Sequence, residues 1–368
     1  MFRSHRNGSR GILNYLETFV VRIVVLTWQP AKRREPNVLS LQAMPFAAVV
    51  RMKRKFYDKV TEAKPADARS RRSAVLLVFL ATLLWSTNGF FAKSPWFHDW
   101  SGLSIACWRA AFASLILFPL VRRPCWSLKL LPVALIFAAM NYFFLNAMQL
   151  GSAANAIWLQ HTAPFWIVLV GFLWLGEKAG WRDLLVLGFQ MIGVVWILVV
   201  ELQGTTAVAV LFGLLAGFTY ALVQLSLRWM RDQDPAWLVA VNHLVTVLVL
   251  LPFVVRFGQF PQGIQWLLLA IFGMLQMGLP YLFFARGLQS LSTHEAAGIV
   301  LLEPVLVPLW VYLAWSQTDH YVPPSWSTFV GGGFILLGLL MRCWTIKIES
   351  QVRPDSRTQD NDPRRETE

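Results

Sequence analysis

Residues 130–149 read LLPVALIFAAMNYFFLNAMQ, a run of 20 residues without a charged side chain. As a helix, such a run is about 30 Å long, which matches the hydrocarbon thickness of a bilayer. Nine further apolar runs of similar length flank it, at 75–93, 103–121, 153–175, 183–200, 206–227, 236–255, 265–286, 294–315 and 326–344. The sequence therefore predicts an all-α integral membrane fold with ten transmembrane helices.

The overall composition supports this prediction. Of the 368 residues, 56% are apolar and 14% are charged, and the mean hydropathy is +0.50. Soluble domains carry about 25% charged residues, because a folded chain in water exposes much polar surface. The three cysteines form no CxxC pair and provide neither a disulfide framework nor a thiolate metal site. An ordinary soluble enzyme, a disulfide scaffold and a disordered chain are thereby excluded.

Positive charge is concentrated at the N-terminus. Residues 1–72 contain 16 of the 33 Lys and Arg and 5 of the 20 Asp and Glu, a net charge of +11. We expect this segment to be a basic extension, partly disordered or interfacial, because residues 11–28 have the apolar spacing of a helix lying on the membrane. Basic segments beside a membrane contact anionic lipid. Nucleic-acid binding is not expected, since no recognition motif accompanies the charge.

Lysine and arginine also distinguish the two sides of the membrane. They recur in every second loop, from Arg69 to Lys347, whereas the alternate loops contain only Lys93 and Arg256. By the positive-inside rule, both termini are cytoplasmic. We therefore expect a multi-pass protein of the inner, or plasma, membrane. Residues 346–368 are mostly polar and are expected to form a disordered cytoplasmic tail.

The apolar runs divide into two similar halves. Residues 141–149, NYFFLNAMQ, align with residues 281–289, YLFFARGLQ, at an offset of 140 residues, and Pro119 aligns with Pro252 at an offset of 133. Each half has an odd number of helices, so equivalent helices cross the membrane in opposite directions. Such inverted repeats are typical of secondary transporters with a site near the midplane. The predicted organisation is a basic extension (1–72), two repeats (73–201 and 202–345) and a tail (346–368).

Short motifs in both halves resemble the EamA type of the drug/metabolite transporter superfamily. The motifs are WRAAFA at 108–113, AANA at 153–156, APF at 163–165, LGEK at 175–178, AA at 296–297, LEPV at 302–305 and GGGFILLG at 331–338. The resemblance covers about 73–345 and implies ten helices in two five-helix repeats. Ser316 and Gln317 stand where that family often has Gly and Glu, and residues 1–72 have no counterpart in it.

Two charged residues lie inside the predicted helices. Arg109 and Glu303 stand at depths where a charge costs roughly 2.5–3.5 kcal/mol on insertion scales. One interpretation is a binding site in which Arg109 holds a carboxylate and Glu303 binds an amine or a proton. The other is a structural ion pair, or an Arg109 that extends to the interface. Because a lone buried charge is expensive, we expect Glu303 to be paired, with Arg109 as its partner, or to be protonated part of the time.

Further polar and aromatic residues complete the predicted substrate site. Asn155 and Thr162 are seven residues apart on one predicted helix face, and Tyr220 and Gln224 are four apart on another helix. The alternative for each is a structural role, such as a histidine bonded to a neighbouring helix or an aromatic ring in the core. The predicted substrate-binding residues are Arg109, Asn155, Trp158, His161, Thr162, Tyr220, Gln224, Tyr281 and Glu303.

Two prolines occupy matching positions in the halves. Pro164 and Pro304 are separated by the offset of 140 residues, and each removes a helix hydrogen bond and frees a carbonyl. We interpret them as hinges that expose backbone to a central site, the alternative being kinks that serve packing alone. The glycines at 331–333 are expected to permit close helix packing.

These features predict a secondary active transporter that exports a small metabolite, such as an amino acid, by alternating access. The alternatives are a nucleotide-sugar or sugar-phosphate carrier of the same superfamily, or a membrane scaffold without transport. No enzyme is predicted and no cofactor or metal is expected: the HExxH-like stretch at 294–298 lacks its second histidine, and no catalytic motif is found. The expected partners are a small-molecule substrate and membrane lipid, with proton coupling and a homodimer left open.

The predicted topology can be tested with reporters fused to the C-terminus. A reporter that is active only in the cytoplasm should be active there, and a periplasmic reporter should be silent, because the basic loops remain on the cytoplasmic side. The same reporters inserted after Arg256, in a loop predicted to face the other side, should show the reverse pattern. A periplasmic signal from the C-terminal fusion would overturn the orientation.

Overall fold

The computed structural model describes residues 68–167, 169, 181–201, 207–291, 293–319, 321, 323–324 and 326–352. Regular secondary structure in these residues is helical throughout. Seven of the described helices are long and apolar enough to cross a membrane. The predicted all-α membrane fold is thereby confirmed. The predicted interfacial helix at 11–28 lies outside the described residues.

The first half of the chain contributes helices up to residue 201. Its first span is divided by a turn at Thr87, whose hydroxyl donates a hydrogen bond to the carbonyl of Leu84 at 2.7 Å. The described elements are α3 (Ala68–Ser86), α4 (Asn88–Ala92), η2 (Pro95–Phe97), α5 (Gly102–Leu117), η3 (Phe118–Leu120), α6 (Leu130–Leu150), α7 (Ala153–Gln160) and α9 (Trp181–Glu201).

The second half begins with two long helices and then becomes irregular. The predicted span at 265–286, the eighth of the chain, contains the π-helical segment η4, a widened turn of the kind often found at functional sites. The described elements are α10 (Ala207–Trp229), α11 (Pro235–Phe257), α12 (Ile264–Ile271), η4 (Phe272–Gly278), α13 (Leu279–Gly287), α14 (Thr293–Val300), α15 (Glu303–Trp315) and α16 (Trp326–Val352).

Two runs that the sequence predicts as single helices are broken. The run at 294–315 is divided because α14 ends at Val300 and α15 begins at Glu303, directly after a turn at residues 301–302. The run at 153–175 is broken in the same way, because α7 ends at Gln160 and a turn follows. The two helix ends are 140 residues apart, the offset of the sequence repeat. The interruption is thus a feature of both halves.

The prolines explain where the breaks occur. Pro304 is the second residue of α15, a position where proline is favoured because its missing N–H has no partner in a first turn anyway. Proline also disfavours helical geometry in the residue before it. Pro164 follows the break after α7 at the matching position. Both prolines therefore begin a new helical segment rather than kink a continuous one.

The last helix is longer than predicted. α16 continues to Val352, so residues 346–352, assigned to a disordered tail, are helical. No Gly or Pro interrupts the chain between Gly338 and Pro354, and helices usually end shortly before a proline. Polar composition alone placed the boundary too early. Residues 353–368 lie outside the described part of the chain.

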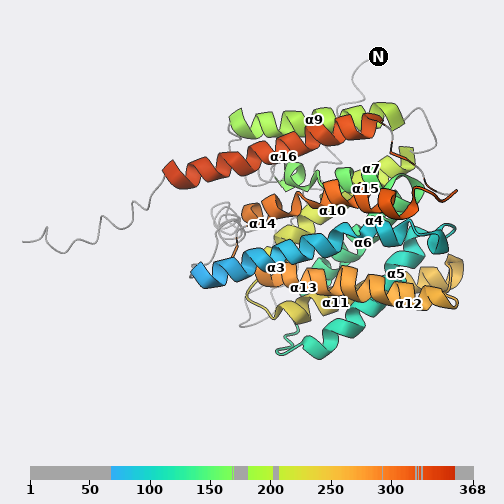
Figure 1. The fold of residues 1–368 in the computed structure, drawn as a ribbon. Helices are drawn as coiled ribbons and strands as arrows, with labels where there is room; N and C mark the ends of the chain where they lie inside the picture. Colours follow the sequence, from blue (N-terminus) through green and yellow to red (C-terminus); the bar gives the residue numbers. More distant parts are fainter. Residues whose placement is uncertain are drawn as a thin grey trace, which may run out of the picture.

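The helices are arranged with α9 and α16 side by side along one flank of the bundle (Figure 1). Their close approach depends on glycine: a β-carbon at Gly193 would lie 2.4 Å from the carbonyl oxygen of Gly331. A β-carbon at Gly332 would lie 2.4 Å from the ring of Trp158, whereas one at Gly333 would meet nothing within 4 Å. The predicted close packing is therefore confirmed for the first two glycines of the triplet.

Helices α5 and α11, one from each half, are joined at both ends. At one end, Ser101 caps the N-terminus of α5 and accepts a hydrogen bond from the backbone N–H of Ser104 at 3.3 Å. Both serine hydroxyls also donate to Oε1 of Gln259, at 3.0 and 2.8 Å. Because Gln259 directly follows α11, its side chain ties the end of α11 to the start of α5.

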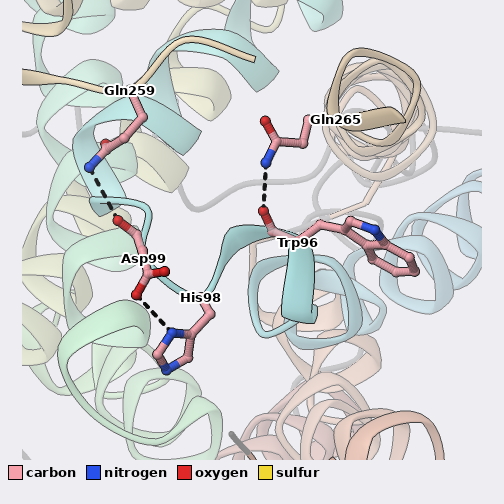
Figure 2. A network of polar contacts seen from close by, with 5 residues as sticks. All are labelled: Trp96, His98, Asp99, Gln259 and Gln265. Carbon is pink, nitrogen blue, oxygen red and sulfur yellow. Dashed lines mark hydrogen bonds and ion pairs between the residues drawn. The ribbon is translucent and has the colours of Figure 1, made fainter. Parts of the chain in front are cut away.

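Neighbouring residues extend this connection. Gln259 donates from Nε2 to the carbonyl of Asp99 at 3.2 Å, and Gln265 of α12 donates to the carbonyl of Trp96 at 2.9 Å (Figure 2). His98 donates from Nδ1 to Oδ1 of Asp99 at 2.9 Å in the same network. The segment before α5 is thereby held against the connection between α11 and α12.

The opposite end repeats the arrangement with a carboxylate. Asp234 caps α11, its Oδ1 accepting from the N–H of Ala236 at 3.0 Å. Its Oδ2 accepts from the N–H groups of Arg122 and Arg123, both at 2.8 Å, in the segment that follows α5. Ser101 and Asp234 are 133 residues apart, the second offset of the repeat. The two-fold symmetry thus includes the caps that join the halves.

These contacts lower the pKa of Asp234 relative to that of an ordinary aspartate. Partial burial by itself raises the pKa of the carboxyl, but the backbone N–H groups of Arg123, Arg122, Ala236 and Trp237 outweigh it and hold the pKa below its ordinary value. A lowered pKa in the folded state contributes stability above the ordinary pKa, about 3.9. That contribution is lost as the pH falls through the folded-state pKa.

We predict that Asp234→Asn lowers the free energy of unfolding by about 1 kcal/mol at pH 7, the usual loss for a damaged N-cap. Asparagine has one side-chain oxygen, so it cannot serve α11 and the Arg122 segment at once. The difference from the wild type should narrow as the pH falls below about 4, because Asp234 is protonated in the unfolded chain there and in the folded protein at a lower pH. Thermal unfolding in detergent at both pH values measures this.

The exposed Asp319 offers a matched control. Asp319→Asn makes the same chemical change and should leave the unfolding temperature unchanged at pH 7. Equal stability of Asp234→Asn and Asp319→Asn would show that the cap does not hold the two helices together.

Candidate functional site

A small cavity lies deep in the bundle, among side chains of both halves. Its volume is about 20 Å³, room for roughly one molecule the size of water. Four of the predicted substrate-binding residues reach it: Arg109, Tyr220, Tyr281 and Glu303. The complete lining is Trp85, Asn88, Arg109, Met140, Phe144, Gln160, Tyr220, Gln276, Met277, Tyr281 and Glu303.

Arg109 is held by neutral partners. Its side chain is buried, with Nη2 donating to Oδ1 of Asn141 at 2.7 Å and Nη1 to Oδ1 of Asn88 at 3.5 Å. The guanidinium carbon lies 5.1 Å from the ring centre of Phe272, a cation–π contact. No carboxylate of the described residues forms an ion pair with Arg109, and its Nε has no hydrogen-bond partner among them. The positive charge is therefore positioned without being neutralised.

Glu303 faces the same cavity from the break between α14 and α15. It is buried and is the first residue of α15, where the helix dipole favours a negative charge. Its basic neighbour is His161, whose Nε2 lies 3.8 Å from Oε2. The expected pairing with Arg109 is therefore wrong, because Arg109 finds its acceptors in two asparagines. The two charged residues share a cavity and do not form an ion pair.

His161 stands in the turn after α7, the counterpart of the break that carries Glu303. Its Nδ1 donates to the carbonyl of Ile157 at 3.0 Å, so the neutral imidazole has a lone pair on Nε2. That nitrogen faces the Glu303 carboxyl. At 3.8 Å the two groups lie beyond direct hydrogen-bond distance, and Nε2 has no hydrogen-bond partner among the described residues. In the described part of the chain no group of three or more His, Cys, Asp or Glu is placed to hold a metal ion.

Two tyrosines form part of the cavity wall. Tyr281 donates from its hydroxyl to the sulfur of Met140 at 3.5 Å, and its ring meets Trp85 edge-on at 4.8 Å between centroids. The ring of Tyr220 lies 6.4 Å from that of His161. Gln224 does not reach the cavity; its side chain forms a hydrogen bond with Tyr220. It acts on the site through that tyrosine.

Three further predicted residues lie away from the cavity. The prediction that Asn155 and Thr162 share a helix face is wrong, because α7 ends at Gln160 and Thr162 lies in the turn. The Thr162 hydroxyl donates to the carbonyl of Leu159 at 2.7 Å and so stabilises that turn. Trp158 packs against α16. Asn155 is buried in α7 without lining the cavity.

Three polar residues of the lining are not among the residues predicted from the sequence. Asn88 begins α4 directly after the turn at Thr87, Gln160 ends α7, and Gln276 lies in the π-helical segment η4. Gln276 donates to the carbonyl of Trp85 at 3.2 Å. Each stands at a helix end or irregularity, where the backbone departs from a regular helix. The sequence feature that could have identified them is an amide side chain inside an apolar run.

Comparison with known proteins agrees with this architecture. A transporter of Archaeoglobus fulgidus is 25% identical over 278 residues, covering 74% of this chain and 97% of the relative. The pseudopaline exporter CntI of Pseudomonas aeruginosa is 26% identical over 286 residues, covering 73% of this chain and 95% of the relative. A solved crystal structure with 18% identity matches 75% of this chain and 98% of its own length, with a TM-score of 0.54, and shares the fold.

The family match spans both halves. Residues 72–199 and 207–342 each match the EamA-like transporter family. The two matched segments correspond to the two halves of the chain. The chain belongs to the EamA-like transporter family.

Proposed function

We propose that the protein exports a small zwitterionic metabolite, such as an amino acid or a derivative of one, by alternating access. The observation that carries the proposal is that Arg109 and Glu303 line one cavity without pairing. A carboxylate bound to Arg109 and an ammonium group bound to Glu303 satisfy both buried charges at once. A neutral solute leaves both charges uncompensated at a depth where that is costly.

The size of the cavity requires a conformational change. About 20 Å³ is too small for an amino acid, so the lining helices must separate before substrate enters. The breaks after α7 and before α15 are suited to this motion, because short segments can tilt where no helix hydrogen bonds continue. The α5–α11 pair, tied at both ends, is suited to remain fixed. We propose that the broken helices move against that pair.

Proton coupling follows from the same residues. In this scheme Glu303, whose carboxyl lies 3.8 Å from His161, carries the proton, and a substrate ammonium group competes with that proton for the carboxylate. Release of substrate to one side and of the proton to the other then links the two fluxes. The export direction rests on the name of the CntI relative. We place the protein in the inner membrane with both termini in the cytoplasm, as the loop charges indicate.

A nucleotide-sugar or sugar-phosphate carrier is the less favoured function. Such substrates carry phosphate groups and call for several cationic side chains at the site. Arg109 is the one basic residue among the cavity-lining side chains of the described chain. Glu303 would also repel a phosphate.

The substrate class can be tested by thermal unfolding of the purified protein with a panel of solutes. Amino acids should raise the unfolding temperature, because a ligand that binds only the folded state stabilises it. Decarboxylated and N-acetylated analogues of the same amino acids should be at least tenfold less effective, since each lacks one charge. Stabilisation by nucleotide sugars, with none by zwitterions, would refute the proposal.

Glu303→Gln should separate coupling from folding. The amide preserves shape and hydrogen bonding but cannot exchange a proton, so transport driven by a pH gradient should fall at least tenfold in proteoliposomes. Exchange of labelled for unlabelled substrate should persist only at substrate concentrations raised about tenfold, because the amide has also lost the charge that binds the substrate ammonium group. Protein abundance should be normal, because no Arg109–Glu303 ion pair exists to be broken.

Glu295→Gln is the matched control, since Glu295 lies on α14 outside the cavity and pairs with Arg71. It should transport like the wild type. Normal gradient-driven transport by Glu303→Gln would disprove the coupling role of Glu303. Loss of the folded protein in Glu303→Gln alone would instead indicate a structural role.

A further inference from the structure

A second and larger hollow opens at the end of the bundle where α3 begins and where α5 and α13 end. Its volume is about 680 Å³, within the range of roughly 300–1,000 Å³ common for ligand sites. It shares no residue with the central cavity. Both halves contribute to its walls, so it is a feature of the assembled bundle.

Three arginines line this hollow, which we name the arginine pocket. Arg122 and Arg123 follow α5, and Arg286 lies in the last turn of α13. All three are exposed, and within the described residues none of their side chains has a hydrogen bond or an ion pair. Each guanidinium group presents a planar fork of donors that matches phosphate oxygens. Residues 164 positions apart in the sequence thus converge on one site.

The backbone fixes two of these arginines in place. The N–H groups of Arg122 and Arg123 both bind Oδ2 of Asp234, so this carboxylate orients the segment through its main chain. Asp232 also lines the pocket. The lining therefore contains three guanidinium groups and two carboxylates, a net charge of +1. Among the other polar side chains of the lining, Ser70 and Ser290 bond each other and Gln289 donates to a carbonyl, whereas Oε1 of Gln233 has no hydrogen-bond partner among the described residues.

One wall of the pocket is apolar. Ala74 and Leu77 belong to the first membrane span, and Leu120 is the last residue of the second. The pocket therefore lies where the apolar spans meet the polar loops, the level at which phosphate groups of a bilayer are found. Basic pockets between transmembrane helices bind phosphate-bearing headgroups in this position.

We propose that the arginine pocket binds a phosphate group, supplied by an anionic lipid headgroup or by a soluble phosphate ester. Arg122, Arg123 and Arg286 hold the phosphate oxygens, and Ala74, Leu77 and Leu120 face the apolar part of a lipid. The arginine pocket shares no residue with the central cavity, so this proposal does not depend on the transport function proposed above.

The test uses the full-length protein in nanodiscs of phosphatidylcholine. Phosphatidylglycerol is titrated into the bilayer, and glycerol phosphate is titrated into the buffer in a separate series, while unfolding temperature is followed. A bound ligand raises that temperature. The triple change Arg122→Gln, Arg123→Gln, Arg286→Gln should weaken the effective ligand by roughly tenfold or more. Its backbone bonds to Asp234 are retained, so the protein should still fold.

Arg72→Gln and Arg256→Gln are matched controls. Arg72 is exposed on α3 outside the pocket, and Arg256 lies at the other end of α11. Each substitution therefore removes one positive charge outside the arginine pocket. Both should respond to ligand like the wild type. If the triple variant does not accumulate, Arg286→Gln alone should bind roughly threefold more weakly.

The two titrations identify the source of the phosphate. A response to phosphatidylglycerol alone assigns a lipid, and a response to glycerol phosphate assigns a soluble ester. Equal stabilisation of the wild type and the arginine variants by whichever ligand is effective, or no stabilisation of the wild type by either, would overturn the proposal.

Discussion

Water is absent from the hydrocarbon core of a bilayer, so every polar group at that depth needs a partner within the protein. Arg109 donates from its two terminal nitrogens to the side-chain oxygens of Asn88 and Asn141, and its Nε has no partner among the described residues. Glu303 begins α15, where the helix dipole favours its charge, and lies 3.8 Å from His161. Arg109 and Glu303 do not form an ion pair with each other. The cavity between them keeps two opposite charges available, which is the property that a site for a zwitterion requires.

The two proposed sites for anionic groups use arginine in different surroundings. Arg109 is buried, where a low dielectric strengthens its attraction for a carboxylate and makes an unpaired charge costly. The arginines of the arginine pocket are exposed, where water and salt weaken each contact and several are needed together. The central cavity is accordingly small and contains one arginine, whereas the arginine pocket is large and contains three.

Most of the fold could be predicted from the sequence. The predictions that were wrong share one physical cause. Apolar runs predict helices because burial in lipid is a sum over neighbouring residues. They do not reveal where a helix is interrupted: Thr162 was placed on a helix face but lies in a turn. Nor do they reveal that Arg228, in the last turn of α10, is buried and donates to the carbonyls of Leu288 and Leu291, which follow α13. Local patterns contain no information on such distant partners.

The sequence by itself determined the helical membrane fold, the two repeats, and Arg109 and Glu303 as residues in need of explanation. Each follows from residues close together in the chain or from their regular spacing. The tertiary structure alone decided that Arg109 binds Asn141 and that Glu303 faces His161. The physical reason is that the rotation and depth of each helix relative to its neighbours depend on packing along its whole length. A shift of one residue along a helix turns a side chain by about 100° and replaces its partners.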